Sequence, residues 1–235
     1  MNNFIWYNPT RILFGRGTHN EVGRETAAYS RRILLLYGGE SLKAAGTYGA
    51  ITKSLTEAGV EYRELGGVRP NPRLSLVRQG ISLCRREGLD FVLAAGGGSV
   101  IDTAKAIAAG VLYPGDVWDF YHTEKRPERV LPTGVVLTIP AAGSESSDGS
   151  VITREEENEK KSFCSPLLYP KFAILNPELC YTLPKRQIAA GSADILAHVM
   201  ERYFSPNGNT ELSDRLCEAA MKTIIHNAPL ALADP

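Results

Sequence analysis

A run of three glycines and a serine, Gly96 to Ser99, stands between an apolar stretch and a helical pattern. The apolar residues 91–95 suit a parallel strand covered on both faces, and the following residues recur at helical spacing, at Ile101, Ala104, Lys105 and Ala108. Glycines let the backbone approach a ligand, and a helix N-terminus carries about half a positive charge. The segment therefore predicts a diphosphate site. A plain tight turn is the alternative, because the spacing is neither a Walker loop nor Gly-x-Gly-x-x-Gly.

A second pair of residues with chemical potential is Asp194 and His198, which are four positions apart. The stretch 188–204 is predicted to be helical, so both side chains lie on one face of the helix. A carboxylate oxygen and an imidazole nitrogen are suitable ligands for a first-row metal ion. Taken alone, the pair is more typical of a hydrogen-bonded surface contact than of a metal site.

Composition narrows the class of partner. The chain has 235 residues, with 26 Lys and Arg against 26 Asp and Glu, so its net charge is zero. A neutral chain has no global field that favours nucleic acid or a membrane surface, and a small-molecule partner is expected. The cysteines lack CxxC spacing and suggest reduced thiols in the cytoplasm; they are Cys84, Cys164, Cys180 and Cys217. No span reaches the roughly 20 apolar residues needed to cross a bilayer.

The positions of the elements follow from periodicity and turn residues. Residues 4–15 contain two apolar and aromatic runs separated by Asn8-Pro9, which predicts a hairpin. Buried strands are expected at 32–37, 91–95 and 131–140, a short alternating strand at 60–65 and a further strand at 172–177. Helices are expected at 42–59 and 74–87, and a charged hairpin or loop at 154–161. From Pro184 onward only helical periodicity remains.

Strands alternating with helices, then helices alone, indicate two domains. The expected fold is an α/β Rossmann-like nucleotide-binding domain with a parallel sheet over residues 1–183. Residues 184–235 are expected to form part of an all-helical domain.

Several segments taken in order resemble the iron-containing alcohol dehydrogenase family, most closely its butanol dehydrogenase-like branch. They are Pro70-Asn71-Pro72, Gly96 to Lys105, Thr138 to Ser146, and Pro184 to His198. The resemblance implies an active site in a cleft between the two domains. There, hydride would pass between NAD(P)(H) and a primary alcohol or aldehyde such as butanol or butyraldehyde. An iron or zinc ion would polarise the oxygen, so no catalytic residue is expected beyond the metal site.

The resemblance also implies roles for single residues. Gly97, Gly98 and Ser99 would present amides to the pyrophosphate, with Asp102 beside them at the coenzyme. The other expected coenzyme contacts are Gly38, Gly39, Ser41, Asn71, Thr138, Ser147 and Lys160. Asp194 and His198 are the expected metal ligands.

The choice of dinucleotide depends on the first loop between strand and helix. Gly38, Gly39, Ser41 and nearby Lys43 resemble the version that leaves room for a 2′-phosphate. Glu40 stands where the branch usually has a small residue, and a carboxylate aimed at the 2′ position would repel phosphate. NADP is favoured, and NAD stays open.

The chain departs from the family near its end. Members complete the metal site with two later histidines, whereas His226 is the only histidine after His198 and is interpreted as structural. This implies a C-terminally incomplete chain, with apolar residues of the last helix, Met221, Ile224, Ile225 and Leu230, left partly exposed. A dinucleotide-binding or dimerisation module without turnover is therefore the alternative. A third possible activity, cyclisation of a sugar phosphate on a related fold, matches the helix motif and the loop less well.

The N-terminal hairpin is expected, by the family resemblance, to join two subunits into a homodimer.

Overall fold

The structure is a computed structural model that describes residues 3, 5–206 and 208–234. Its contacts divide the chain into two units, which are described separately. The larger consists of residues 8–138 and 143–179, and the smaller of residues 1–7, 139–142 and 180–235. The smaller unit is therefore formed by three separate segments of the chain. The predicted domain boundary after residue 183 stays a prediction.

The larger unit is built on a sheet of six parallel strands in the order β1-β8-β5-β4-β2-β3. The strands are β1 (Arg11–Phe14), β2 (Arg32–Tyr37), β3 (Glu61–Leu65), β4 (Phe91–Gly96), β5 (Thr133–Leu137) and β8 (Phe172–Leu175). Every strand predicted after residue 30 is present, with ends within a few residues of those expected. The predicted Rossmann-like fold with a parallel sheet is confirmed.

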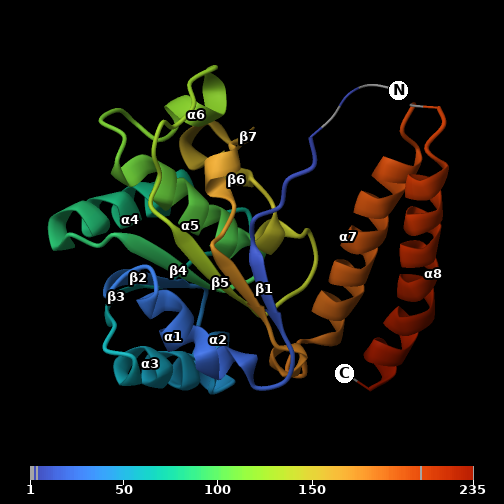
Figure 1. Cartoon of the computed structure of the whole chain (residues 1–235), viewed down its shortest axis with the longest axis horizontal. Helices are drawn as coiled ribbons and strands as arrows, with labels where there is room; N and C mark the ends of the chain where they lie inside the picture. The colour runs from blue at the N-terminus through green and yellow to red at the C-terminus, as the bar shows by residue number, and fades with distance from the viewer. Residues whose placement is uncertain (1–2, 4, 207, 235) are drawn as a thin grey trace. The chain divides into compact units, whose positions relative to one another are not determined.

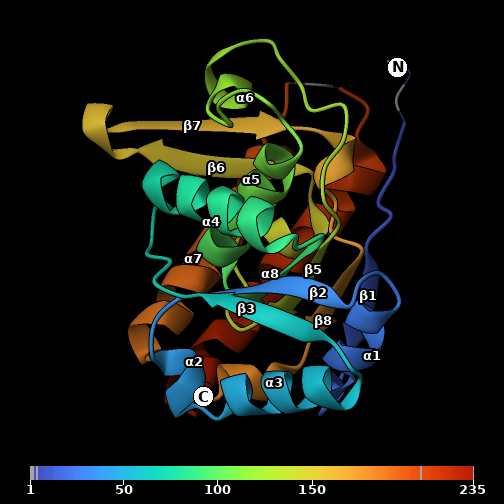
Figure 2. The same cartoon turned by 90° about the vertical axis from the view of Figure 1, so that its left-hand side faces the viewer.

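Helices cover both faces of this sheet, as Figure 2 shows. They are α1 (Val22–Ala27), α2 (Ser41–Ala44), α3 (Thr47–Glu57), α4 (Leu74–Glu87) and α5 (Gly98–Val111), whereas the short helix α6 (Asp119–His122) contacts residues 159–164 instead. Alternate strand residues point to opposite faces. Leu34, Leu36 and Val92 belong to the core beneath α4 and α5, whereas Ile33, Leu35 and Leu93 belong to the core beneath α1 and α3. All six side chains are fully buried, which explains why the strands have apolar runs rather than alternation.

The helical segment predicted over 42–59 is interrupted. Helix α2 ends at Ala44, and Gly46 adopts a left-handed conformation with φ 76° before α3 begins at Thr47. Glycine adopts this conformation without steric cost, which allows the chain to change direction there. The continuous helix was therefore wrong at residues 45–46, while the helical assignment on either side is confirmed.

The predicted N-terminal hairpin is wrong. Residues 5–10 form no strand, and β1 pairs in parallel with β8 instead of with a preceding strand. The side chain of Asn8 accepts a hydrogen bond from the amide of Thr10 (3.2 Å) and donates one to Ser146 Oγ (2.7 Å). This local bond gives Asn8-Pro9 an entry turn into β1. Phe4, which the hairpin included, lies outside the described residues.

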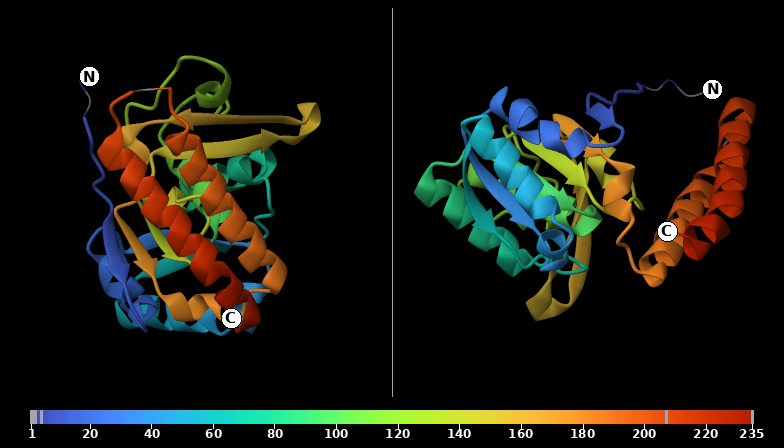
Figure 3. Two further views of the ribbon diagram at one scale, coloured as in Figure 1. Left: turned by 90° about the vertical axis from the view of Figure 1, so that its right-hand side faces the viewer. Right: turned by 90° about the horizontal axis from the view of Figure 1, so that it is seen from below.

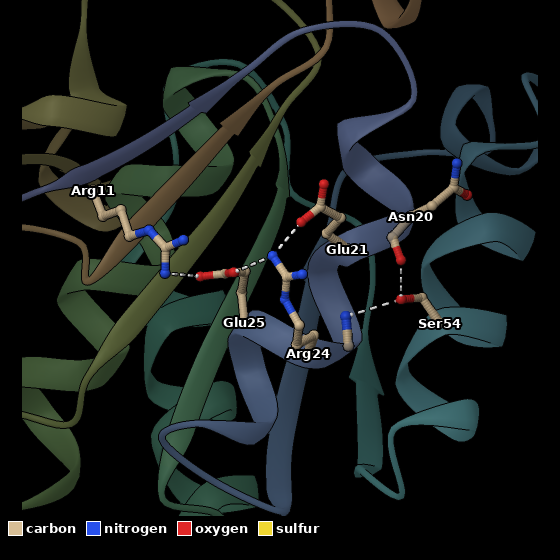
Figure 4. Close-up of polar contacts among 7 residues, drawn as sticks. Arg11, Asn20, Glu21, Arg24, Glu25 and Ser54 are labelled. Atoms are coloured by element: carbon tan, nitrogen blue, oxygen red, sulfur yellow. Dashed lines mark hydrogen bonds and ion pairs between the residues drawn. The ribbon is translucent and has the colours of Figure 1, made fainter.

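The edge strand β1 is joined to α1 by an ion-pair network (Figure 4). The Glu25 carboxylate, 6% exposed, accepts from Arg11 Nη1 at 2.9 Å and from Arg24 Nη2 at 3.1 Å. Helix α1 also approaches α3 closely, because Ser54 Oγ accepts from the Gly23 amide at 3.0 Å. A Cβ on Gly23 would stand 1.9 Å from the Ser54 carbonyl oxygen, so only glycine fits.

The charged segment predicted as a hairpin or loop is a hairpin. Strands β6 (Gly149–Arg154) and β7 (Glu159–Cys164) pair antiparallel, joined by a 3-10 turn at Glu155–Glu157. Further 3-10 turns lie at Thr18–Glu21, Ser144–Ser146, Pro166–Leu168 and Pro177–Cys180.

The smaller unit is mainly a helical pair. Helices α7 (Lys185–Tyr203) and α8 (Glu211–Ala233) lie side by side, as Figure 1 and both views of Figure 3 show. Residues Pro140 and Ala141 pack against Gly191 of α7, where a Cβ would stand 3.0 Å from the Pro140 carbonyl oxygen. On α8, Ile225 is 64% and Leu230 57% exposed, and Met221 and Ile224 are half-buried, as expected. Among the described residues, no helix combines the length and apolar character that crossing a bilayer requires.

Candidate functional site

The strand order places a topological switch point between β2 and β4. From β2 the chain moves outward to β3, and it then returns to the other side of β2 with β4. The loops after β2 and β4 therefore leave in opposite directions, which is where open α/β sheets bind ligands. The two predicted glycine turns, Gly38–Gly39 and Gly97–Gly98, follow these two strands. An ideal Cβ on Gly38 would lie 4.0 Å from Val100 Cγ2, so the turns are neighbours.

The turn after β4 has an open approach to the helix N-terminus. The amides of Val100 and Ile101 donate to the Gly97 carbonyl at 2.9 and 3.2 Å. Because the first amides of a helix have no partner within it, those of Gly98 and Ser99 are available to an anion. A Cβ on Gly98 would meet nothing within 4 Å. Gly96 differs, since its Cβ would lie 2.5 Å from Val100 Cγ2.

The next strand adds Thr138 to the same edge. Gly96 and Leu137 are paired in register, and the Thr138 amide donates to the Gly96 carbonyl at 3.1 Å. Thr138 thus lies beside the end of β4, as the sequence predicts for a residue at the end of the central strand.

Asp102 lies on α5, one turn after Ser99, and both of its carboxylate oxygens are engaged within the protein. Oδ1 accepts from Ser144 Oγ at 2.6 Å, and Oδ2 accepts from the Val151 amide at 3.2 Å. Burial raises the pKa of Asp102, against the lowering effects of the Ser144 hydrogen bond and the Lys105 charge. The aspartate therefore ties α5 to the segment that contains Ser144 and Ser147.

Asn71 and Lys160 come together from separate elements. Lys160, on β7, donates to Asn71 Oδ1 at 3.0 Å. Asn71 precedes α4 and adopts a left-handed φ of 57°, which asparagine tolerates better than most residues. These two predicted coenzyme contacts are exposed and form one polar pair.

A cluster of aromatic and charged groups surrounds the loop after β2. Glu64 accepts hydrogen bonds from Tyr37 OH at 2.9 Å and from Tyr48 OH at 2.5 Å. The Glu64 hydrogen bond is the main cause that raises the pKa of Tyr48, whereas burial is the main cause for Tyr37. The Lys43 ammonium lies 5.4 and 5.5 Å from the centres of the Tyr37 and Tyr48 rings. It also lies 3.6 Å from Glu40, whose side chain is 83% exposed.

A hollow of about 220 Å³ adjoins this loop. Its lining includes Gly67, whose amide donates to the Gly38 carbonyl at 2.8 Å. Two exposed guanidinium side chains, those of Arg69 and Arg73, contribute to the same lining. The remaining lining residues are Ser75, Leu76 and Gln79. The hollow is therefore positively charged and begins beside the Gly38 turn.

The two predicted metal ligands share one face of α7. His198 Nε2 lies 3.8 Å from Asp194 Oδ1, and the side chains are 43% and 46% exposed. Their oxygen and nitrogen atoms suit a divalent first-row ion, and both are accessible to one. Within the part of the chain that the structure describes, no third His, Cys, Asp or Glu joins them. His226 lies exposed on α8. The pair supplies two ligands of the three or four that a protein metal site needs.

Comparison with models of known families identifies the family of this chain. The family model for iron-containing alcohol dehydrogenase matches residues 9–177, and the model of the family's C-terminal part matches residues 188–235. The chain belongs to the iron-containing alcohol dehydrogenase family. All of the predicted site residues fall inside the two matched ranges.

Relatives within the iron-containing alcohol dehydrogenase family share the whole length of this chain. Probable NADH-dependent butanol dehydrogenase 1 of Bacillus subtilis is 46% identical over 234 residues, which are 100% of this chain and 60% of the relative. The NADPH-dependent aldehyde reductase YqhD of Escherichia coli is 40% identical over 238 residues, again 100% of this chain and 61% of the relative. The chain thus spans about 60% of the length of the curated relatives it matches.

A solved structure confirms the fold of this family member. The crystal structure of NADH-dependent butanol dehydrogenase A from Thermotoga maritima superposes with a TM-score of 0.96 at 41% identity. It covers 100% of this chain, which corresponds to 59% of that protein.

Sequence reasoning missed three features beside the predicted site. It placed Lys105 in a helical stripe and in the run that resembles the family but gave the side chain no role, although the residue is fully buried. A charged residue within an otherwise apolar stripe was the available signal. The Tyr37, Tyr48 and Glu64 cluster and the hollow at Arg69 and Arg73 gave no local signal, because their members come together only in the fold.

Proposed function

We propose that this chain carries the coenzyme site and two metal ligands of an oxidoreductase. The reaction is hydride transfer between NAD(P)(H) and a primary alcohol or aldehyde such as butanol or butyraldehyde. The observation that carries the proposal is the pair of glycine turns at the switch point between β2 and β4, in a chain of the iron-containing alcohol dehydrogenase family. Relatives named as butanol dehydrogenases and as an aldehyde reductase support the substrate class.

In this proposal the chain's own groups bind and orient the dinucleotide. The amides of Gly98 and Ser99 at the start of α5, together with the Gly97 turn, bind the diphosphate. Such amides are fixed in place and need no reorganisation when the ligand arrives. Thr138, beside the end of β4, and Ser147, whose carbonyl accepts from the Lys105 ammonium, are proposed to contact the dinucleotide. The Asn71–Lys160 pair is proposed to contact the ribose region.

We propose NADP(H) as the preferred coenzyme, with Gly39 and Ser41 leaving room for the 2′-phosphate. Glu40 does not oppose this, because its side chain is 83% exposed and faces the Lys43 ammonium at 3.6 Å. The guanidinium groups of Arg69 and Arg73 add positive charge beside the Gly38 turn. A phosphate is well recognised by guanidinium groups, which offer paired donors. The named relatives include NADH-dependent and NADPH-dependent proteins, so the coenzyme choice has to be measured.

Dissociation constants for NADPH and NADH test the coenzyme choice. Arg69→Ala is expected to weaken NADPH binding about tenfold while leaving NADH binding within about twofold. Because the exposed Glu40 carboxylate faces the Lys43 ammonium, Glu40→Gln should leave the ratio of the two dissociation constants within about twofold. Lys53→Met, on α3 and paired only with Glu57 in the described chain, is the matched charge control. Equal weakening of both coenzymes by Arg69→Ala would contradict a role at the 2′-phosphate.

Asp194 and His198 are proposed to hold the metal ion. The family's name makes iron the proposed ion, and zinc is tested beside it. A bound divalent ion would supply Lewis acidity toward the alcohol or aldehyde oxygen. The two side chains fix its position on α7. With the metal as electrophile, no further catalytic residue is proposed in this chain.

The alternative function is a dinucleotide-binding or dimerisation module without turnover. It is favoured by the metal pair, which has no third ligand among the described residues. This alternative predicts coenzyme binding by the 235-residue chain without metal-dependent oxidation of NADPH.

One experiment separates the two functions. NADPH oxidation with butyraldehyde is measured for the chain alone and for a chimera that adds the part of the Bacillus subtilis relative without a counterpart here. Fe²⁺ under anaerobic conditions, Zn²⁺ and a chelator are compared. Activity of the chimera with Fe²⁺ and its loss with chelator are expected. An inactive, folded chimera that loads metal and binds NADPH would refute the oxidoreductase proposal.

A homodimer remains proposed, although the hairpin on which it was based is absent. Strand β1 pairs with β8 on one side only among the described residues, and it leaves Phe14 72% and Ile12 45% exposed, so its outer edge is available to a second copy. Light scattering should give twice the chain mass, and Phe14→Glu should reduce it to one. An unchanged mass in Phe14→Glu would exclude this edge. The cytoplasmic location also stays a proposal.

A further inference from the structure

Lys105 is the one lysine in the described chain whose side chain is fully buried. It projects from α5 toward the segment that connects β5 with β6. Its ammonium donates to three main-chain carbonyls, those of Ser144 at 2.7 Å, Ser147 at 2.8 Å and Gly149 at 3.0 Å. A lysine ammonium has three N–H donors, so its capacity matches these three acceptors.

Asp102, one turn before Lys105 on α5, also binds this segment. Ser144 Oγ, which lies 3.1 Å from the Lys105 ammonium, donates to Asp102 Oδ1 at 2.6 Å. The main-chain carbonyl of Asp102 accepts from Ser150 Oγ at 2.8 Å, and its carboxylate accepts from the Val151 amide. Residues 144–151 are thus bound to α5 by a set of contacts that we call the α5 clamp.

Burial of an ammonium group costs free energy unless its hydrogen bonds are satisfied, and an apolar side chain of similar size would cost less. The contacts of Lys105 all go to one segment, which includes Ser147. Lys105 itself lies on α5, the helix that begins with the Gly98 and Ser99 amides. A buried charge of this kind can select one conformation of the segment that it contacts over the alternatives.

We propose that Lys105 is a positioning residue for coenzyme binding, which holds residues 144–149 against α5 in the conformation that the dinucleotide requires. It does so from beneath the segment and does not touch the coenzyme. The inference rests on the dinucleotide site proposed above. It assigns the two halves of the Gly-Gly-Gly-Ser-x-x-Asp-x-x-Lys sequence to different tasks. The glycines and serine receive the diphosphate, and the aspartate and lysine shape the neighbouring segment.

The charge state of Lys105 gives this proposal a measurable signature. Burial lowers its pKa to about 8, against the raising effects of Asp102, Asp148, Glu145 and Cys164. The neutral amine keeps two N–H donors, so one of the three carbonyls loses its partner above this pH. Coenzyme affinity is therefore expected to fall as the pH rises through about 8.

The test compares coenzyme affinity with local order in the intact chain. Lys105→Met keeps a long unbranched side chain and removes the donors. It should weaken NADPH binding about tenfold or more and remove the pH dependence. Hydrogen exchange of amides 144–151 should become faster even without coenzyme. Ser144→Ala, which removes the link to Asp102 without leaving a charge unpaired, should show both effects to a smaller degree.

Two controls separate positioning from general stability. Lys53→Met removes an exposed lysine on α3, and Glu25→Ala destabilises the chain at the β1–α1 contact far from the clamp. Both should leave NADPH affinity and the exchange of 144–151 unchanged. If Lys105→Met fails to fold, the NADPH affinity of Ser144→Ala and the hydrogen exchange of its amides 144–151 decide.

The outcomes are distinct. NADPH affinity of Lys105→Met equal to that of the unaltered chain, or unchanged hydrogen exchange of amides 144–151 in that variant, would overturn the proposal. A chain that binds no NADPH or NADH at all would refute the dinucleotide site itself. In that case faster exchange of 144–151 in Lys105→Met would still establish the clamp.

Discussion

Replacement of Gly98 by alanine should separate coenzyme binding from stability. Gly98 begins α5, its φ is not in the left-handed region, and a Cβ there would meet no atom within 4 Å. The protein itself therefore has no need for glycine at this position. If the diphosphate lies against the amides of Gly98 and Ser99, a methyl group would occupy the space that the phosphate oxygens need.

The expected magnitudes come from one hydrogen bond to the diphosphate and from the backbone entropy of glycine. A hydrogen bond to a charged group contributes about 1.5–3 kcal/mol, and each 1.4 kcal/mol is tenfold in affinity, so removal of one such bond weakens binding about 10- to 150-fold. Replacement of glycine by alanine within a helix removes backbone entropy from the unfolded chain and stabilises by up to about 1 kcal/mol. Gly98→Ala should thus bind coenzyme more weakly while unfolding at a slightly higher temperature.

Two glycines serve as matched controls. Gly49, on α3, also has open space around its Cβ position, so Gly49→Ala should give the same small stabilisation with unchanged affinity. At Gly96 the Cβ would lie 2.5 Å from Val100 Cγ2, so Gly96→Ala should lower stability by about 1–3 kcal/mol. Affinity is measured by titration calorimetry with NADPH, and stability by thermal unfolding. Coenzyme affinity within about threefold of the unaltered chain in Gly98→Ala would refute the diphosphate site.

Three further predictions concern charges. Glu25→Ala leaves Arg11 without its partner in the β1–α1 network and should lower the free energy of unfolding by about 1–2 kcal/mol in denaturant titrations; no change would mean that the network adds nothing to stability. Because the pKa of Lys105 is lowered to about 8 in the folded chain, the unfolded chain binds more protons between about pH 8 and about pH 10.5. The free energy of unfolding should therefore rise over this range by up to about 3 kcal/mol more than in Lys105→Met, and parallel curves would contradict it. Asp194→Ala and His198→Ala should each abolish metal loading measured by elemental analysis while NADPH affinity stays unchanged; metal retained at the original level would remove them from the site.

Local patterns predicted most of the sheet because each of its central strands is buried on both faces. The runs at Arg32–Tyr37 and Phe91–Gly96 are apolar for that reason, and the glycine turns that follow mark the carboxyl edge. Helix α4 was predicted over the residues that it occupies, since its apolar positions recur at helical spacing and Gly88 ends it. Here local preference and tertiary packing favour the same structure.

The errors arose where distant segments decide the outcome. Strand β1 pairs with β8, whose residue Phe172 is opposite Arg11, and no local pattern reveals a partner so far along the chain. The Asn8-Pro9 turn was read as the middle of a hairpin although it is the entry to a single strand. The proposed coenzyme site was predicted in part. The glycine turns were found from their place between an apolar run and a helical pattern, whereas the contacts of Asp102 and Lys105 with residues 144–151 required the fold.

The three separate entries of the chain into the smaller unit affect how that unit can form. Helices α7 and α8 are close in sequence and can associate early, but the contact of Gly191 with Pro140 closes a loop that contains β6, β7 and β8. Closing so long a loop is entropically unfavourable until its interior is ordered, so this contact should form late in refolding. For the same reason, protease cleavage after residue 179 would not yield two self-sufficient fragments, because residues 139–142 would stay with the sheet and lose the helix on which they pack.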